Sequence, residues 1–541
     1  MKNLSIKLFS MLVIMLLCLS PLSAIDLNQG DNTPIINGTD TKNDNNIADV
    51  NDTINNNIKD NNSDVEIKSI NETDNFKNKE ECKNRSLNDT NTSKNLTTLK
   101  DNAPGTFADL QTEINNAPAG SVLHLTRNYE GAEDTVIELN KDLTIDGNGH
   151  TIDCKSLENC EAFTSKSGKI TLKNLRIING CNDGSSPFGG YCGGAIIIKD
   201  SAQYTIENCY FENNYADDYG GAIYSADSSK LKIIGCTFNH NKADDSDGGA
   251  IYSSSESELE ILNSKFTGNN AYDNGGAICA INSLLKIKNS TFDSNRAEGS
   301  ANPCYGGAIR GKNVEVHSCD FNNNFAENHG GAIYADSVTI DNTVPSSFAS
   351  NTAKKGEGGA IYTDYLNENI KYLTLYNNSA AIDNSDDGGA IYLNKENHVT
   401  FSQCSIVSNH CGDEGGAIYL DSTNSHISLI NNIIIANRAG DEGHVVFNKG
   451  NYDTINNNWW GDINPSSDNG LLVEWKTFGS NVHHVDSDPL RSQLKIEDNP
   501  VGINETAVAT YYFVKSDGSQ FTGELEAPVS FILPENIIKE S

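Results

Sequence analysis

Short segments of alternating apolar and polar residues recur through the middle of the chain. Examples are Leu231-Lys-Ile233, Leu259-Glu-Ile261, Leu285-Lys-Ile287 and Val314-Glu-Val316. A period of two places the apolar side chains on one face of a β-strand, and these units carry no helical stripe of ten or more residues. The pattern predicts an all-β protein made of short strands.

A glycine motif divides these strands into units of similar length. Gly-Gly followed by Ala-Ile, or a variant of it, begins at Gly193, Gly220, Gly248, Gly275, Gly306, Gly330, Gly358, Gly388 and Gly415, and in degenerate form at Gly443. The gaps between successive motifs range from 24 to 31 residues, with a mean of about 28. A fixed period of this length indicates a repeat architecture.

A second motif keeps the same register: an apolar residue, an asparagine three residues later and a small residue two further on. The nine copies are Phe211/Asn214/Ala216, Phe238/Asn241/Ala243, Phe266/Asn269/Ala271, Phe292/Asn295/Ala297, Phe321/Asn324/Ala326, Phe348/Asn351/Ala353, Leu375/Asn378/Ala380, Ile406/Asn409/Cys411 and Ile434/Asn437/Ala439. Each unit therefore supplies about three short strands separated by turns, as in one coil of a parallel β-helix. Stacked at the strand spacing, some 12 coils between Val122 and Trp460 would form a rod about 60 Å long.

The residue types suit such a stack. Paired glycines allow a positive φ at a corner, after which the isoleucine can point inward. The repeated asparagine tolerates a left-handed backbone and can stack its amide on the neighbouring coils. The six phenylalanines would form an internal aromatic column. We therefore interpret these residues as structural.

These repeats resemble those of the polymorphic outer-membrane proteins of chlamydiae, and more closely those of adhesin-like surface proteins of methanogenic archaea. Thr106 to Ile114 and Ile145 to Ile152 are similar to the first coils of the archaeal proteins, and Asn458-Trp-Trp-Gly461 is similar to their closing motif. The resemblance covers about residues 103–490. It implies a right-handed single-stranded parallel β-helix at the cell surface, with a role in attachment.

The two ends of the chain differ from the repeats. Residues 1–24 have the pattern of a secretory signal peptide, with a short membrane anchor as the alternative. Residues 25–102 are rich in Asn, Asp and Thr without a hydrophobic period, which predicts a disordered linker that carries potential glycosylation sites. Residues 491–541 predict strands at Thr506 to Val514 and Ala527 to Leu533, with a turn at Asp517-Gly518. These are too few strands for an immunoglobulin-like sandwich, so we expect either a truncated chain or strands that dock on the rod.

Composition narrows the choice of partners. The chain has 73 acidic and 39 basic residues, a formal net charge of −34 and a pI of about 4.6. A broad cationic face for phosphate backbones is therefore not expected, and we predict no nucleic-acid partner. After removal of the signal, no apolar run is long enough to cross a membrane. The expected partners are glycans or surface proteins of other cells.

Acidic residues stand just before Gly-Gly in nearly every unit, so we expect them to form a ridge along the stack. The slot holds Asp217-Asp218, Asp244-Asp245, Asp273, Glu298, Glu327, Glu357, Asp386-Asp387, Asp413-Glu414 and Asp441-Glu442. A solvated loop row, partly neutralised by Lys242, Arg296, Lys354, Lys355 and Arg438, is the favoured interpretation. Structural calcium is the alternative, although the glycine-rich calcium nonapeptide is absent.

A polysaccharide lyase or glycoside hydrolase is an alternative, because such enzymes also use parallel β-helices. They need a local constellation of carboxylates, whereas these acids repeat on every coil. The sequence therefore predicts no catalytic, cofactor-binding or metal-binding residues. The favoured function is a secreted or cell-surface adhesin-like protein that is not an enzyme. A carbohydrate-active enzyme and a passive cell-envelope component remain the alternatives.

The cysteines, histidines and tryptophans support a structural interpretation. Cys209, Cys236, Cys319 and Cys404 share one inward slot and are expected to behave as small hydrophobes. Cys154/Cys160 and Cys181/Cys192 are spaced for local disulfides if the compartment is oxidising. His329 and His444 are expected at the surface. Trp459, Trp460 and Trp475 are expected to cap the end of the rod.

Overall fold

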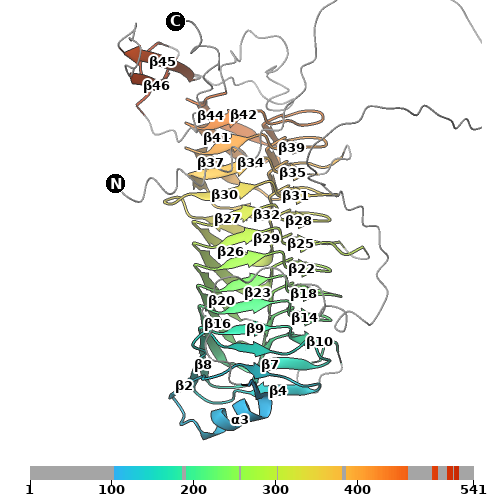
Figure 1. Cartoon of the computed structure of the whole chain (residues 1–541). Helices are drawn as coiled ribbons and strands as arrows, with labels where there is room; N and C mark the ends of the chain where they lie inside the picture. Colours follow the sequence, from blue (N-terminus) through green and yellow to red (C-terminus); the bar gives the residue numbers. More distant parts are fainter. Residues whose placement is uncertain are drawn as a thin grey trace, which may run out of the picture. The chain divides into compact units, whose positions relative to one another are not determined.

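The computed structural model describes residues 103–184, 190–254, 257–300, 303–380, 385–460, 490–497, 508–515 and 517–522. Residues 103–460 form a parallel β-helix, in which each coil stacks on the one before it (Figure 1). The predicted signal peptide (1–24) and the predicted linker (25–102) lie outside the described residues, so both stay predictions.

One face of the stack is a parallel sheet of 13 strands. Its strands are β1 (Gly105–Thr106), β3 (Tyr129–Glu130), β6 (Thr151–Asp153), β9 (Arg176–Ile178), β13 (Tyr210–Glu212), β17 (Thr237–Asn239), β21 (Lys265–Thr267), β24 (Thr291–Asp293), β27 (Asp320–Asn322), β30 (Ser346–Ala349), β34 (Leu373–Tyr376), β38 (Ser405–Val407) and β42 (Ile433–Ile435). The stack thus has about 13 coils, one more than expected, because β1 adds a strand before Val122.

A sheet of 27 strands forms the other walls. Its short strands include β10 (Cys181–Asn182), β14 (Tyr215–Ala216), β18 (Lys242–Ala243), β22 (Asn270–Ala271), β25 (Arg296–Ala297), β28 (Phe325–Ala326), β31 (Thr352–Ala353), β35 (Ser379–Ala380) and β39 (His410–Cys411). The strands that follow Gly-Gly are β11 (Ile196–Ile198), β15 (Ile223–Ser225), β19 (Ile251–Ser253), β23 (Ile278–Lys288), β26 (Ile309–His317), β29 (Ile333–Ile340), β32 (Ile361–Leu366), β36 (Ile391–Leu393), β40 (Ile418–Leu420) and β43 (Val446–Asn448).

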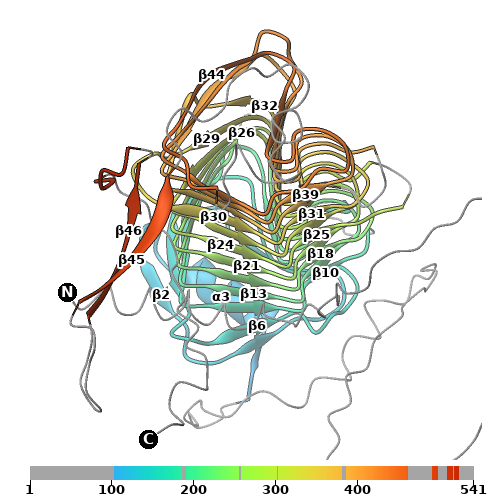
Figure 2. The ribbon, with the colours of Figure 1, turned by 90° about the horizontal axis from the view of Figure 1, so that it is seen from above.

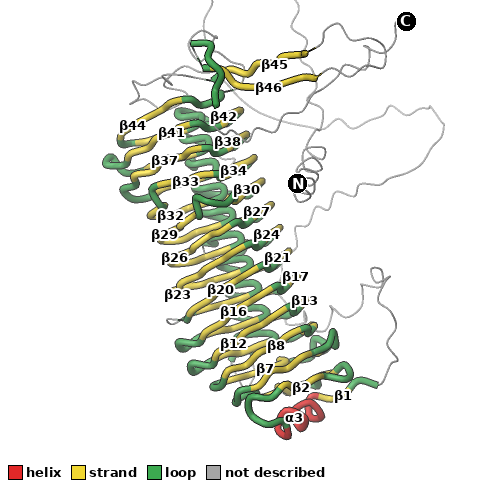
Figure 3. Tube along the Cα trace, turned by 90° about the vertical axis from the view of Figure 1, so that its left-hand side faces the viewer, coloured by secondary structure: helices red, strands yellow, loops and turns green. Residues whose placement is uncertain are grey.

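Further strands complete the coils on the remaining side. Those of the same sheet are β2 (Val122–His124), β4 (Thr135–Glu138), β5 (Leu143–Asp146), β7 (Cys160–Ser165), β8 (Lys169–Lys173), β12 (Gln203–Glu207), β16 (Lys230–Ile234) and β20 (Glu258–Leu262). Towards the C-terminal end, a separate four-stranded sheet of β33 (Asn369–Lys371), β37 (His398–Ser402), β41 (His426–Ile430) and β44 (Asn451–Asn456) takes their place (Figure 3).

A helix closes the N-terminal end of the stack. Helix α3 (Phe107–Asn116) begins with a capping box, in which the Asp109 N–H donates to Thr106 Oγ1 (3.1 Å) and the Thr106 N–H donates to Asp109 Oδ2 (2.9 Å). Phe107, Leu110 and Ile114 are buried against the first coils. The segment whose sequence is similar to a first coil is therefore mainly a helical cap.

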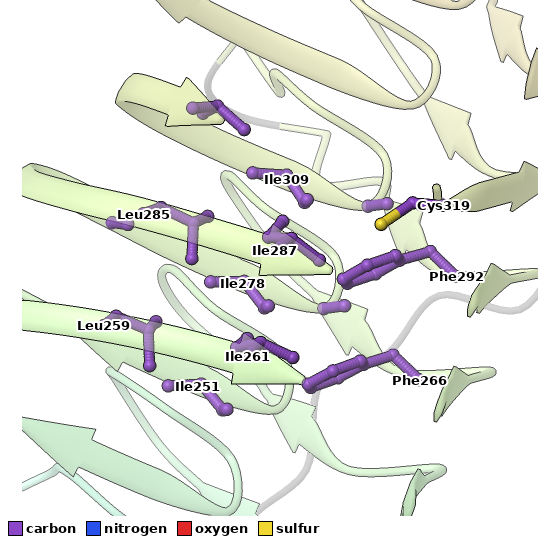
Figure 4. Close-up of a cluster of buried hydrophobic side chains, with 14 of the residues drawn as sticks. Ile251, Leu259, Ile261, Phe266, Ile278, Leu285, Ile287, Phe292, Ile309 and Cys319 are labelled. Atoms are coloured by element: carbon purple, nitrogen blue, oxygen red, sulfur yellow. The ribbon is translucent and has the colours of Figure 1, made fainter. Parts of the chain in front are cut away.

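The predicted aromatic column is confirmed. The six rings from Phe211 to Phe348 stack with centroids 4.6–4.8 Å apart and planes within 6° of parallel. Figure 4 shows Phe266 and Phe292 beside the isoleucine and leucine side chains of the neighbouring strands. All six are fully buried, so the column contributes both apolar burial and favourable stacking.

The asparagine ladder is also confirmed, with one correction. From Asn214 to Asn437, each Nδ2 donates to the Oδ1 of the asparagine on the next coil at 2.9–3.0 Å. The left-handed residue, however, is the one before the ladder asparagine, for example Asn213 (φ 54°), His240 (φ 51°) or Ala436 (φ 58°). The prediction that the ladder asparagine adopts this conformation was wrong, because its buried amide is committed to the ladder.

The paired glycines have two separate roles. The first has φ between 63° and 72° in all ten motifs, as expected, and the following isoleucines are buried. The second lies against the adjacent coil: a Cβ on Gly249 would stand 2.1 Å from the Gly276 carbonyl oxygen. Close stacking of the coils therefore excludes any side chain at this position.

The shared cysteine slot is buried, as predicted, but its thiols are more than apolar fillers. The Cys209 N–H donates to Cys236 Sγ (3.3 Å), and the Cys236 N–H donates to Ser264 Oγ (3.1 Å). The Cys404 N–H donates to Asn432 Oδ1 (2.9 Å) in the same way. Cysteine, serine and asparagine thus alternate as acceptors for the backbone of the preceding coil.

The predicted local disulfides do not form. Cys192 carries a free thiol although Cys181 is disulfide-bonded, so the pairing of these two was wrong. Cys154 and Cys160 are also free and buried, and burial together with a hydrogen bond to Cys160 raises the pKa of Cys154. Sequence spacing thus brought Cys154 and Cys160 together without fixing the state of their thiols, and it did not identify the partner of Cys181.

Near the C-terminus, β45 (Arg491–Glu497) pairs antiparallel with β46 (Val508–Val514), and the predicted turn has Gly518 at φ 83°. The sequence predicted the second strand but not its partner. Ala527 to Leu533 and Trp475 lie outside the described residues, and an incomplete immunoglobulin-like segment stays a prediction. Trp460 is buried in the core, and the Trp459 ring lies 5.2 Å from the Phe513 ring.

Candidate functional site

The loops that lead from the short strands to Gly-Gly form one continuous edge, which we call the loop edge. Viewed along the stack, the loops that follow β39, β31 and β25 gather at one corner of the coil (Figure 2). Backbone hydrogen bonds link successive loops, such as the Asp245 N–H to the Asp217 carbonyl (2.7 Å) and the Asp413 N–H to the Asp386 carbonyl (3.1 Å). The predicted ridge of acidic residues therefore lies on a regular scaffold.

The C-terminal part of the loop edge comprises residues 385–387, 412–414 and 440–442. Asp387 is half-buried, and its Oδ1 accepts the Glu414 N–H at 3.0 Å. Burial and the neighbouring carboxylates raise the pKa of Asp387 and that of Glu414 to about 7. Like charges at coil spacing thus remain largely unbalanced in this part.

The N-terminal part, residues 217–219 and 244–247, is similar. Burial and the charges of Asp245 and Asp218 raise the pKa of Asp217 to about 6. Asp247 is buried and accepts hydrogen bonds from the Asn274 backbone (3.0 Å) and Nδ2 (2.7 Å). Lys242 pairs with Asp244 at 2.5 Å, as the sequence predicted for this lysine.

The central part, residues 296–300, 303–305, 327–329 and 354–357, is different. Glu327 forms salt bridges with two lysines: Lys355 Nζ lies 2.6 Å from Oε1 and Lys354 Nζ lies 3.2 Å from Oε2. Burial alone would raise the pKa of Glu327, but the two lysines outweigh it and the pKa is lowered. Burial would also raise the pKa of Glu357, but the His329 imidazole outweighs it and the pKa is lowered.

His329 was expected at the surface, where its side chain is 26% exposed, but it also takes part in the packing of the loops. Its ring lies between Tyr305 (5.3 Å) and Tyr362 (5.2 Å), and its Nδ1 accepts the Glu357 N–H at 3.0 Å. His444 similarly accepts the Ala439 N–H through Nδ1 (3.0 Å). Both histidines help to order the loops.

A row of aromatic rings under the loops was missed by the sequence analysis. Tyr305, Tyr334, Tyr362, Tyr392, Tyr419 and Phe447 stack with successive centroids 4.5–5.4 Å apart. The signal was present, because most Gly-Gly-Ala-Ile motifs are followed by tyrosine. Cys279 and Arg310 occupy the tyrosine position on two successive coils beside the central part, and they interrupt the row there.

The central part also contains an open pocket of about 520 Å³. It is lined by Arg296, Glu298, Gly299, Ser300, Pro303, Phe325, Glu327, Asn328, Lys354 and Lys355. The Arg296 guanidinium lies 4.2 Å from the centre of the Phe325 ring, and its Nε donates to Glu298 Oε2 at 2.6 Å. The pocket is thus a local departure from the acidic pattern of the other loops.

Across the described residues, no group of three or more His, Cys, Asp or Glu side chains is arranged to hold a metal ion. The same residues include no helix with the length and apolar character that a membrane crossing requires. Structural calcium therefore remains a prediction without a defined site.

Comparisons with known proteins agree with this architecture. Residues 128–266 and 194–347 match the family described as a right-handed β-helix region, and the coil is right-handed as expected. Residues 345–364, which include Phe348, Asn351 and the Gly358 motif, match the Chlamydia polymorphic membrane protein repeat. The predicted likeness to the chlamydial repeats is therefore confirmed.

One curated relative is the probable outer membrane protein pmp6 of Chlamydia pneumoniae. The two proteins are 30% identical over 148 residues, which cover 23% of this chain and 11% of the relative. The chain thus spans about a tenth of the length of the relative that it matches. No solved structure matches the chain.

Proposed function

We propose that this protein is a cell-surface, adhesin-like β-helix that attaches to glycans or to surface proteins of other cells and is not an enzyme. The observation that carries the proposal is the repeat itself, because the same loop recurs on successive coils and presents a long, continuous surface. The match of one repeat to those of chlamydial polymorphic membrane proteins supports a place at the cell surface. The resemblance to adhesin-like proteins of methanogenic archaea belongs to the same proposal.

The physical properties of the rod support attachment. The interior is filled by ladders that leave the outward side chains free to vary from coil to coil. Repeated loops at constant spacing can hold several weak contacts at once, which raises the overall affinity by multivalency. The net charge of −34 opposes any partner that is itself a long polyanion.

A carbohydrate-active enzyme is the second candidate. The observation that favours it is the pKa of about 7 at both Asp387 and Glu414, since a general acid needs a carboxyl that is protonated near neutral pH. Asp217 on a distant coil has a similarly raised pKa, however, and a property shared by distant coils is better explained by crowding of like charges. We therefore rank attachment first.

Binding and turnover should be measured together on the full chain. A glycan array and a whole-cell binding assay would run beside a reducing-end assay on the same polysaccharides. We expect saturable binding without product release. Product release that Asp387→Asn abolishes would replace attachment with catalysis. A rod that binds neither glycans nor cells and releases no product would favour a passive envelope component.

A further inference from the structure

We propose that the pocket of the central loop edge binds the carboxylate of an acidic sugar at the end of a glycan. This inference deepens the attachment function proposed above and rests on it. It begins from the charge of the pocket, where Arg296, Lys354 and Lys355 face the two carboxylates of Glu298 and Glu327. Three cations against two anions give a local excess of positive charge on a strongly acidic protein.

The two carboxylates are already engaged within the fold. Glu298 Oε2 accepts a hydrogen bond from Arg296 Nε (2.6 Å), and Glu298 Oε1 accepts one from Asn270 Nδ2 (2.7 Å). Glu327, whose side chain is only 15% exposed, receives a lysine on each oxygen. Each carboxylate is therefore paired with a cation inside the fold.

The cations, by contrast, keep donors for a ligand. The hydrogen bonds of the described residues use Nε of Arg296 and leave its two terminal nitrogens directed at no described acceptor. Lys354 and Lys355 have side chains 53% and 61% exposed, and each ammonium has N–H groups beyond those used by Glu327. Arginine offers a planar pair of donors that fits a carboxylate.

The other walls suit a sugar ring. Phe325 is half-buried and lines the pocket together with the Arg296 guanidinium, which lies over its ring, while Asn328 and Ser300 supply polar groups. The volume of about 520 Å³ falls within the roughly 300–1,000 Å³ of small-ligand sites. An aromatic ring beside charged and amide groups is a combination that recognises the apolar and polar faces of a pyranose at once.

The flanking loops select the length of the ligand. Towards the N-terminus, Asp217, Asp218, Asp244, Asp245 and Asp247 face a single lysine, Lys242. Towards the C-terminus the edge carries Asp386, Asp387, Asp413, Glu414, Asp441 and Glu442. A long polyanion laid along the edge would meet these carboxylates on both sides and be repelled. A single terminal acidic sugar meets only the central cations.

Calorimetric titration of the full chain tests the proposal with three probes: the methyl glycoside of glucuronic acid, the methyl glycoside of glucose, and inorganic phosphate. We expect the glucuronide to bind at least about 10-fold more tightly than the neutral glucoside. Phosphate should bind more weakly than the glucuronide. Equal binding of glucuronide and glucoside, no binding of either, or phosphate binding as tight as that of the glucuronide would each overturn the proposal.

Matched variants test whether the glucuronide binds in the pocket. Lys354→Gln with Lys355→Gln should lower glucuronide affinity about 10-fold, and Arg296→Lys, which keeps the charge but loses the planar donor pair, should lower it several-fold. The control is Lys230→Gln with Lys232→Gln, because these lysines also pair with glutamates, Glu258 (3.0 Å) and Glu260 (2.7 Å), but lie in strand β16 and do not line the pocket. An equal loss in the control would contradict the site. Circular dichroism and thermal unfolding would verify that each variant folds.

The failure of this site and that of the attachment function are distinguishable. If the wild type attaches to cells but does not bind the glucuronide, the pocket assignment fails and attachment stands. If it binds the glucuronide and the pocket variants lose that binding, but no variant or wild type attaches to cells or glycans, the pocket stands and attachment fails.

Discussion

The central and C-terminal parts of the loop edge occupy the same position on successive coils and yet have opposite electrostatics. Two lysines lower the carboxyl pKa of Glu327 and the His329 imidazole lowers that of Glu357, whereas burial and like charges raise the pKa of Asp387 and of Glu414 to about 7. Every one of these loops ends in the same Gly-Gly corner. The comparison teaches that the repeat fixes where a side chain stands but not what balances its charge.

The largest expected effect concerns the interior, where the two parts should not differ. Asn351→Ala and Asn409→Ala each remove a buried amide that donates to the next asparagine and to a backbone carbonyl. We expect each to lower the free energy of unfolding by about 3 kcal/mol, because the freed donors and acceptors stay buried. Urea denaturation would measure both. A difference above about 1 kcal/mol would mean that the two parts differ in their cores as well.

A smaller effect should separate the parts. Glu327→Gln removes the partner of both Lys354 and Lys355, and we expect a loss of about 1 kcal/mol that shrinks as salt is added. The matched change Glu414→Gln removes an unbalanced charge and should be neutral or stabilising at pH 8. The free energy of unfolding of both variants would be measured by denaturation at low and at high ionic strength. Equal destabilisation by the two changes would erase the distinction.

The pH dependence sharpens the same contrast. Unfolded carboxyls titrate near pH 4, whereas the folded pKa values of Asp387 and Glu414 are about 7, so the folded state binds more protons between these limits. Stability of the C-terminal part should therefore rise as pH falls from 8 to 5. The lowered pKa of Glu327 acts oppositely, and its contribution is lost only as pH falls below about 4.

Hydrogen exchange, corrected for intrinsic rates, can follow residues 385–420 and 325–360 separately. Slower exchange at pH 5 than at pH 8 is expected in the first range only. Asp387→Asn with Glu414→Gln should remove that pH response. If the double variant responds like the wild type, other carboxyls cause the effect.

The smallest effect is expected from calcium. Because no described group of side chains is arranged to hold a metal, millimolar calcium should act on the acidic loops mainly by screening. The melting temperature in calcium should then match that in sodium chloride of equal ionic strength to within about 1 °C. A larger rise that a chelator reverses would restore structural calcium as an explanation.

The sequence predicted the features that every coil must repeat. The phenylalanine column, the asparagine ladder and the positive φ of the first glycine follow from spacing alone, because stacked coils bring equal positions together. The left-handed residue was placed one position late, since a buried amide and a left-handed backbone are both compatible with asparagine. The tyrosine row was overlooked although its residues stand in register.

Features that depend on a single coil were not predictable. The pairing of Lys354 and Lys355 with Glu327 joins adjacent loops of different composition, and no spacing rule gives their side-chain directions. The pocket is lined by Phe325, Lys354 and Lys355, whose positions hold other residue types in the other repeats. The free thiol of Cys192 shows the same limit, because proximity in the chain did not make it the partner of Cys181.

The hydrogen bonds between coils all run along the axis of the stack, and this has a mechanical consequence. Tension applied along that axis loads all coil boundaries in series, and the end coils, which have a neighbouring coil on one side only, would detach first, so the rod would lengthen coil by coil from its ends. Each detached coil of about 28 residues releases roughly 90–100 Å of chain. A rod held between two surfaces would therefore yield in equal steps and dissipate work at each one, while its remaining coils stay folded.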